Sequence, residues 1–144
     1  MVLCSGYVGL TTAVLFAEAN FKVTTVDVKK EIVETINRGT CPIKEPELDE
    51  LLKLNVDAGR LRATLNTSEA LKRAEITIIC VQTPIDEDKK PDLSFLMKAL
   101  RNLGEHLKKE MVVIISSTVP PKTISEMAMP TLESLSNLKA ESDF

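Results

Sequence analysis

The stretch that decides the fold is Ser5-Gly6-Tyr7-Val8-Gly9-Leu10, which follows the apolar residues 2–4 and precedes a helix-forming run at 10–19. A strand that enters a helix through closely spaced glycines leaves backbone N–H groups unpaired at the helix start, where a pyrophosphate can accept them. We therefore interpret this stretch as a dinucleotide-binding turn. The usual Gly-x-Gly-x-x-Gly pattern is incomplete, because Cys4 occupies the first glycine position. Taken alone, the turn is equally typical of a tight strand-to-helix connection.

An acidic residue at the end of the next predicted strand favours the first interpretation. Asp27 closes the β-branched run 22–27 and lies 21 positions after Gly6, close to the roughly 20 positions expected for an acid that binds the adenosine ribose hydroxyls. A carboxylate there would repel the 2′-phosphate of NADP, so NAD is the expected cofactor. The nearby Lys29 and Lys30 weaken this preference. A solvated aspartate at a strand end is the alternative.

Composition excludes several classes of function. The 144 residues predict one domain with a sizeable core, because 44% of them are hydrophobic and 27% are charged. A net charge of −3, with 3% aromatic residues and no Trp, argues against nucleic-acid and membrane partners. The apolar runs are far shorter than the ~20 residues that span a bilayer, and the start does not resemble a signal peptide. Three cysteines without metal-ligand spacing indicate no zinc site and no disulfide framework, so a reducing cytoplasm is expected.

Strand-like and helix-like segments alternate along the whole chain. This alternation predicts an α/β fold with a Rossmann-like, doubly wound parallel sheet in strand order 3-2-1-4-5. Residues 2–4 are too few for a complete central strand, so the first strand is expected to be shortened. The predicted strands are 2–4, 22–27, 60–65, 76–81 and 111–116, and the predicted helices are 9–19, 29–38, 46–57, 67–73, 93–109 and one from about 122, which Pro130 should kink or split.

Polar residues collect where the predicted strands end. Thr83 and Thr118 each follow a buried strand, and either could donate a hydrogen bond to a cofactor or substrate or belong to an ordinary turn. His106 is expected on the solvated face of the helix 93–109. Cys80 is interpreted as a small core residue and Cys41 as a loop thiol, because neither has the neighbours that would make it a nucleophile.

Five short segments of the sequence, taken in their order along the chain, resemble the N-terminal NAD-binding domain of the UDP-glucose/GDP-mannose dehydrogenase family. Together they extend over nearly the whole chain. The segments 89–94 and 138–144 look most like the branch that oxidises UDP-N-acetylmannosamine or UDP-N-acetylglucosamine. The five segments are Gly6-Tyr7-Val8-Gly9-Leu10, Val26-Asp27, Ile36-Asn37-Arg38-Gly39 with Pro42-Ile43-Lys44-Glu45-Pro46, Val81-Gln82-Thr83-Pro84 and Ser117-Thr118-Val119-Pro120.

The resemblance implies a reaction and a set of site residues. Family members oxidise C6 of a nucleotide sugar such as UDP-glucose to the uronate with two NAD+ molecules, in polysaccharide biosynthesis, and the full-length enzymes are expected to be homo-oligomers. Thr118 would lie at the junction of cofactor and substrate and assist the chemistry. By matching position, the pyrophosphate would be bound by Gly6, Tyr7, Val8 and Gly9, the ribose by Asp27, and the remainder of the cofactor by Thr83, Pro84, Ser117 and Thr118.

The sequence also departs from the family pattern. Cys4 adds a side chain at the tight turn, which predicts weakened cofactor binding, Ile32 stands where many members have a basic residue, and Lys122 stands where glycine is usual. Residues 1–144 would form a truncated NAD-binding domain, with the last strand, the central helix and the substrate domain absent and no activity expected of the chain alone. Alternatives are a non-catalytic nucleotide-binding or interaction module and a different dehydrogenase family on the same fold.

Overall fold

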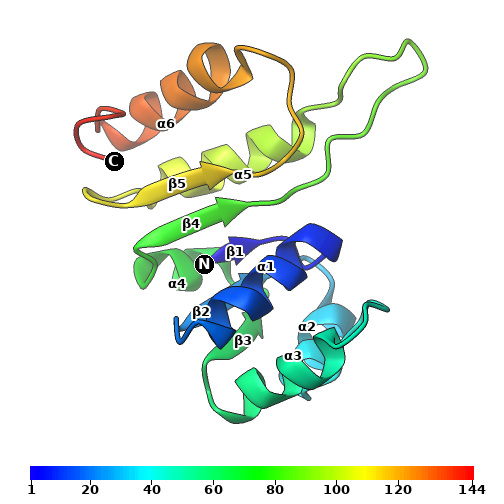
Figure 1. Cartoon of the computed structure of the whole chain (residues 1–144). Coiled ribbons are helices and arrows are strands. Elements are labelled where there is room, and N and C mark those ends of the chain that lie inside the picture. Colours follow the sequence, from blue (N-terminus) through cyan, green and yellow to red (C-terminus); the bar gives the residue numbers. More distant parts are fainter.

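A computed structural model describes residues 1–144 and contains one parallel sheet of five strands in the order β3-β2-β1-β4-β5, as predicted (Figure 1). All four neighbouring pairs are parallel, so each connection is a crossover that carries at least one helix. The carboxyl ends of the strands therefore meet at one edge of the sheet. The strands are β1 (Val2–Leu3), β2 (Val23–Val26), β3 (Leu61–Thr64), β4 (Ile76–Ile79) and β5 (Val112–Ile115).

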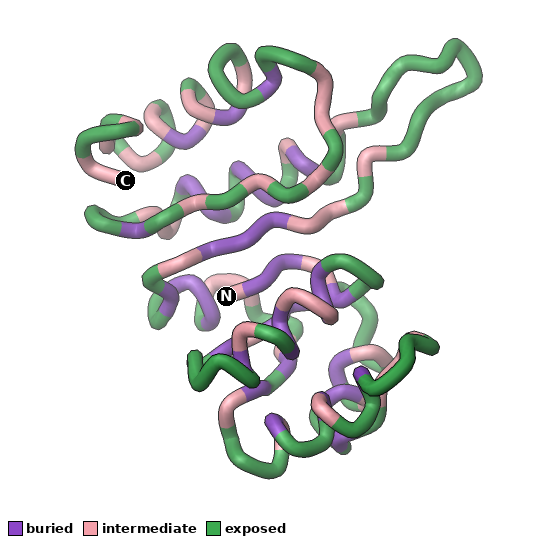
Figure 2. The backbone as a smooth tube through the Cα atoms, viewed as in Figure 1, coloured by how far each residue is buried: buried purple, intermediate pink, exposed green.

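Helices cover both faces of the sheet and divide the buried apolar residues into two clusters (Figure 2). One cluster joins the sheet to α1 (Tyr7–Glu18), α2 (Lys30–Asn37) and α3 (Leu48–Asp57). The other joins it to α4 (Thr67–Lys72), α5 (Ser94–Gly104), a π-helical segment η1 (Ile124–Ala128) and α6 (Met129–Ser136). Val2 belongs to the first cluster and Leu3 to the second, because successive side chains of a strand point to opposite faces.

The first strand is shortened, as predicted. Val2 pairs with Thr25 and Ile78, although β2 begins at Val23 and β4 at Ile76, so the neighbours extend two residues further at their amino ends. The Met1 ammonium donates to the Ile76 carbonyl at 2.6 Å, and partial burial lowers the pKa of this amino group. The Met1 carbonyl accepts from the Ile78 N–H at 2.9 Å, so Met1 continues the pairing with β4, and a pocket of about 310 Å³ lies at this amino end of β1.

Three helix boundaries differ from the predicted ones by two residues or more. The helix predicted from residue 9 begins at Tyr7. The helix predicted from Pro46 begins at Leu48, because Glu47 adopts a left-handed conformation with φ of 63° and so interrupts the helical path. The helix predicted to reach residue 109 ends at Gly104, where α6 crosses so closely that a Cβ would lie 2.8 Å from the Cβ of Leu135. The predicted start of α4 is confirmed, since Asn66 Oδ1 accepts from the Glu69 N–H. The last helix changes from the π-helical η1 to α6 between Ala128 and Met129, directly before Pro130.

His106 does not lie on a solvated helix face. It follows the end of α5 and is half-buried, with Nε2 2.6 Å from the Ser68 hydroxyl oxygen and Nδ1 3.1 Å from the Asn102 carbonyl oxygen. The early end of α5 removes this residue from the helical pattern on which the prediction depended. It instead connects the chain after α5 to α4.

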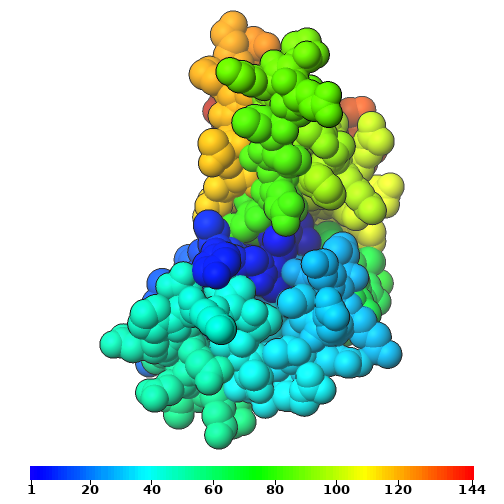
Figure 3. All heavy atoms as spheres, turned by 90° about the vertical axis from the view of Figure 1, so that its right-hand side faces the viewer, coloured from blue at the N-terminus to red at the C-terminus, as the bar shows by residue number.

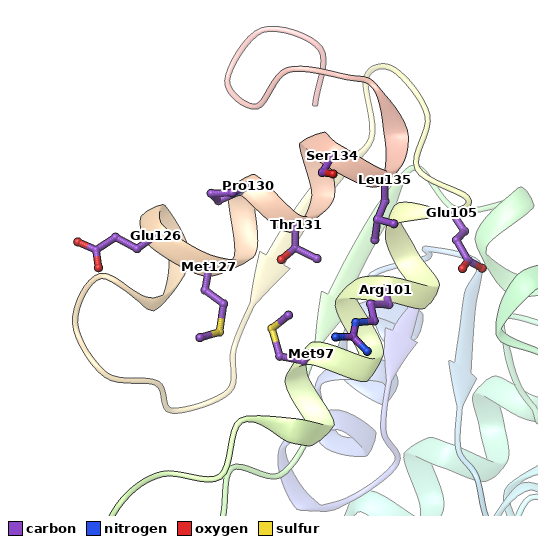
Figure 4. Close-up of a pocket in the computed structure, with 9 residues that line it drawn as sticks. All are labelled: Met97, Arg101, Glu105, Glu126, Met127, Pro130, Thr131, Ser134 and Leu135. Atoms are coloured by element: carbon purple, nitrogen blue, oxygen red, sulfur yellow. The ribbon is translucent and has the colours of Figure 1, made fainter.

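An open groove of about 480 Å³ lies between α5 and the η1–α6 segment, beside the point where α5 and α6 pack together (Figure 4). Met97, Met127 and Leu135 supply its apolar surface, and charged residues including Arg101 and Glu126 stand at its rim. None of the site residues predicted from the sequence lines this groove. The candidate site therefore has to be sought at the carboxyl edge of the sheet.

Candidate dinucleotide-binding site

The turn after β1 brings the start of α1 directly against the end of the strand. Cys4 has φ of 83°, a region that L-residues rarely adopt, and its N–H donates to the Val26 carbonyl at 2.8 Å. A Cβ on Gly9 would lie 1.9 Å from the Cys4 carbonyl oxygen. Glycine is therefore required at position 9 by the packing of the turn itself.

Gly6 is not required for the same reason. Its φ is −76° and ψ is −169°, which any residue adopts, and the nearest atom to a Cβ there would be the Cys4 sulfur at 3.9 Å. The residue is exposed, so a side chain would point into open space beside the helix start. The absence of a side chain instead leaves the backbone open to close approach by a ligand.

The start of α1 can accept an anion. No side chain caps this end of the helix, and no acidic residue lies in its first turn. The first N–H groups of a helix have no intrahelical acceptor, and the helix dipole makes this end positive. Exposed Tyr7 and Val8 present these groups at the carboxyl edge of the sheet. This donor set fits a pyrophosphate.

Asp27 is bound to the same turn. Its Oδ2 accepts from the Ser5 N–H at 2.9 Å, and its Oδ1 accepts from the Lys29 N–H at 3.0 Å. Ser5 is also linked to β2 through its hydroxyl, which lies 2.9 Å from that of the buried Thr25. The Asp27 carboxylate is half-buried and oriented by two backbone donors, yet each oxygen retains a second lone pair for a ligand hydroxyl.

The predicted residues after β4 and β5 also come together. The Thr83 hydroxyl donates to the Thr118 carbonyl at 2.8 Å, and the Ser117 hydroxyl donates to the Val81 carbonyl at 2.7 Å. The single proton of the Thr83 hydroxyl is therefore used within the chain, and its oxygen remains an acceptor toward a ligand. The Thr118 side chain is exposed at the same edge.

Sequence reasoning missed an apolar component of this edge. Val28 is 88% exposed and Leu65 is also exposed, although they lie two residues after the end of β2 and one after the end of β3. The view onto the edge in Figure 3 shows the turn after β1 between the residues after β4 and β5 above and those of α2 and α3 below. Exposed apolar side chains beside a polar turn suit the faces of an aromatic base. Large apolar residues directly after predicted strands are the signal that could have revealed them.

Burial disfavours the thiolate form of two of the three cysteines, Cys41 and Cys80. Burial raises the pKa of Cys80, and the neighbouring Cys4 adds to this shift, while a hydrogen bond with Ser116 opposes it. Burial likewise raises the pKa of Cys41. No group of three or more His, Cys, Asp or Glu side chains is placed to hold a metal ion. None of the helices has both the length and the apolar character needed to span a membrane.

Comparison with known proteins decides the family. The family model described as "UDP-glucose/GDP-mannose dehydrogenase family, NAD binding domain" matches residues 1–144. The chain belongs to this family. It is 43% identical over 143 residues to the UDP-N-acetyl-D-mannosamine dehydrogenase of Pyrococcus horikoshii, which covers 99% of this chain and 34% of that protein. It is 41% identical to a Pseudomonas aeruginosa UDP-glucose 6-dehydrogenase over 85% of this chain and 27% of the relative.

Solved structures of UDP-glucose/GDP-mannose dehydrogenase family members share the fold. A ternary complex of GDP-mannose dehydrogenase from Pseudomonas aeruginosa superimposes with a TM-score of 0.95 at 32% identity and covers 99% of this chain and 34% of that one. The Pyrococcus horikoshii UDP-N-acetylmannosamine enzyme gives a TM-score of 0.93 at 40% identity over 100% of this chain and 34% of that one. The chain thus spans about a third of the length of these relatives and corresponds to the NAD-binding domain of the family.

The departures from the family pattern have definite structural positions. Cys4 and Lys122, at the two positions where the family resemblance leads us to expect glycine, have φ of 83° and 70°, so both lie in the left-handed region that favours glycine. Ile32 packs partly against the first core cluster. The two glycine replacements therefore add backbone strain at two turns on the cofactor edge, whereas Ile32 adds to the core.

Proposed function

We propose that this chain binds NAD at the turn after β1 and supplies the cofactor half of a nucleotide-sugar dehydrogenase site. The observation that carries the proposal is the hydrogen bond from the Ser5 N–H to Asp27 Oδ2 at 2.9 Å. It links the open helix start to an oriented carboxylate. These are the two groups that the pyrophosphate and the ribose of a dinucleotide require.

Each predicted residue has a role in this proposal. The N–H groups of Tyr7 and Val8 bind the pyrophosphate, Gly6 permits its close approach, and Gly9 maintains the turn. Asp27 accepts hydrogen bonds from the adenosine ribose hydroxyls. Support comes from the uncapped start of α1 and from the two backbone donors that orient the Asp27 carboxylate.

The residues after β4 and β5 serve the other end of the cofactor. Thr83 and Pro84 would hold the nicotinamide end of the cofactor, for which the Thr83 oxygen is available as a hydrogen-bond acceptor. Ser117 keeps the turn after β5 against β4 through its bond to Val81. Thr118 faces the junction with the substrate and is the catalytic residue of this chain. When bound, NAD accepts a hydride from the carbon that is oxidised.

We propose a UDP-sugar as substrate, oxidised at C6 to the uronate with two NAD+. The relatives are named for UDP-N-acetyl-D-mannosamine, UDP-glucose and GDP-mannose, which supports a nucleotide sugar. These 144 residues alone are expected to form no NADH with UDP-N-acetylmannosamine, UDP-N-acetylglucosamine or UDP-glucose. Turnover with any of these sugars would contradict the proposal that the chain supplies only the cofactor half of the site. Three free cysteines support a location in a reducing cytoplasm.

Calorimetric titration with NAD tests the proposal. The chain should bind NAD saturably and more tightly than NADP, and Asp27→Ala should abolish detectable binding. Asp57→Ala is the matched control, because Asp57 is an exposed acid at the end of α3. Absence of saturable NAD binding in the unmodified chain would favour the alternative of an interaction module on the same fold.

A further inference from the structure

Two cysteines directly follow the paired ends of the adjacent strands β1 and β4 at the centre of the sheet. The register of β1 with β4 pairs Leu3 with Ile79, so Cys4 and Cys80 are the next residues on two adjacent strands. The Cys80 N–H donates to the Leu3 carbonyl at 3.0 Å, which preserves the pairing at this point. Adjacent strands lie about 4.8 Å apart, within the Cα separation of roughly 4.4 to 6.8 Å that a disulfide bridges.

Both side chains border the first turn of α1. The Cys4 sulfur would lie 3.9 Å from a Cβ on Gly6, and the Cys80 Cβ would lie 3.4 Å from a Cβ on Gly9. Both thiols are free and half-buried, so a small reagent can reach them. We propose that Cys4 and Cys80 form an oxidisable dithiol under the glycine turn, which a small disulfide such as oxidised glutathione converts into an intrachain disulfide.

The reaction balances as two thiol–disulfide exchanges. The Cys4 thiolate attacks one sulfur of the oxidant, forms a mixed disulfide and releases one small thiolate. The Cys80 thiolate then attacks the Cys4 sulfur and releases the second. The protein loses two electrons and two thiol protons, and the oxidant becomes two thiols. Burial raises the pKa of Cys80, which favours Cys4 as the first of the two to react.

The third cysteine is not part of this pair. Cys41 lies in the connection between α2 and α3, where its N–H donates to Asp49 Oδ1 at 2.8 Å and its side chain packs against the first core cluster. Burial and the acidic neighbours Asp49 and Glu45 raise the pKa of its thiol. Cys41 is therefore the control cysteine.

Closure of the disulfide is expected to alter the cofactor turn. The Cys4 carbonyl oxygen and Gly9 are in contact, because a Cβ on Gly9 would lie only 1.9 Å from that oxygen. A backbone rotation at Cys4 that brings its sulfur to Cys80 would therefore move the first turn of α1. This consequence rests on the proposed NAD site, and we expect the bridged form to bind NAD at least about tenfold more weakly, equivalent to 1.4 kcal/mol.

Peptide mapping of the folded chain tests the dithiol without reference to NAD. The chain is equilibrated with oxidised glutathione, its remaining thiols are alkylated, and it is digested with trypsin without reductant. The expected product links peptides 1–22 and 74–89 with loss of two hydrogens, and Cys41→Ser gives the same product. In Cys80→Ser the reaction stops at a glutathione adduct on Cys4. A bridge that includes peptide 39–44, or an adduct on Cys4 beside an unreacted Cys80 in the unmodified chain, would overturn the proposal.

Titration of the reduced and bridged forms with NAD separates the two hypotheses. Weaker binding by the bridged form, restored by dithiothreitol, supports the expected effect on the cofactor turn. Equal affinity of the two forms overturns that effect. If the reduced chain binds no NAD, the proposed function fails, whereas the peptide map still decides whether the dithiol exists.

Discussion

The segments after β1 and β5 both lie at the carboxyl edge of the sheet, and each contains a non-glycine residue with positive φ. Their surroundings differ. In the first, Cys4 has φ of 83°, and in the second, Lys122 has φ of 70°. The first lies at the centre of the sheet, where Ser5 is buried and Gly9 contacts the strand end. The second follows the edge strand, and Lys122 is exposed. The comparison shows that surrounding structure, rather than the backbone angle, decides how strongly such a turn is constrained.

The largest effect is expected from Gly9→Ala in the first turn. The added Cβ would lie 1.9 Å from the Cys4 carbonyl oxygen, a backbone atom that cannot rotate away. We expect a loss of at least about 3 kcal/mol in the free energy of unfolding, measured by urea denaturation. Gly6→Ala is the matched control, because its Cβ has only a contact at 3.9 Å and stability should change by less than about 1 kcal/mol. Similar losses for the two variants would contradict the packing described for Gly9.

The next effect is that of Asp27→Ala on folding. Ser5 is buried, so removal of the carboxylate leaves its N–H without an acceptor, at a cost of about 1 to 3 kcal/mol in the free energy of unfolding. Thr83→Val provides the corresponding test after β5, where loss of the bond to the exposed Thr118 should cost less than about 1 kcal/mol. Thermal melts of both variants measure the difference. A larger loss of stability in Thr83→Val than in Asp27→Ala would show that the turn after β5 is the more strongly constrained of the two.

A smaller and opposite effect is expected from Cys4→Gly. A left-handed conformation costs an L-residue about 1 to 2 kcal/mol, and part of the gain is offset by the greater entropy of glycine in the unfolded chain. We expect the free energy of unfolding to rise by roughly 0.5 to 1 kcal/mol. NAD affinity should rise as well, because the sulfur near Gly6 is removed. A decrease in either quantity would show that Cys4 does not strain the turn.

The smallest effect is expected from Lys122→Gly. It relieves the same type of strain, but it removes an exposed ion pair of 3.2 Å between Lys122 and Glu126 and adds entropy to the unfolded chain. We expect a change of less than about 0.5 kcal/mol in the free energy of unfolding. Differential scanning calorimetry of Lys122→Gly and Cys4→Gly under the same conditions compares the stabilities of the two variants directly. A gain in Lys122→Gly that exceeded the gain in Cys4→Gly would contradict the ranking of the two turns.

Local signals were sufficient where the determinant lies within a few residues. The glycine turn, the cap at Asn66 and the change from η1 to α6 beside Pro130 are such cases, and all were predicted. The end of α5 was predicted wrongly: the leucine spacing continues to Leu107, whereas the helix ends at Gly104, which packs against Leu135, 31 positions further along the chain. The position of His106 was wrong for the same reason. The apolar side chains of Val28 and Leu65 were overlooked, because their exposure is a property of the assembled edge.

The sequence by itself determined the order of strands and helices, the parallel sheet and the set of polar residues at its carboxyl edge. These features follow from periodicity, glycine and proline positions and the right-handedness of crossovers, which act locally along the chain. Only the tertiary structure decided that Asp27 accepts from the Ser5 N–H, that the proton of Thr83 is used on Thr118, and that Cys4 lies beside Cys80. Each of these contacts joins residues more than 20 positions apart, and strand register, which depends on the whole core, determines which of them meet.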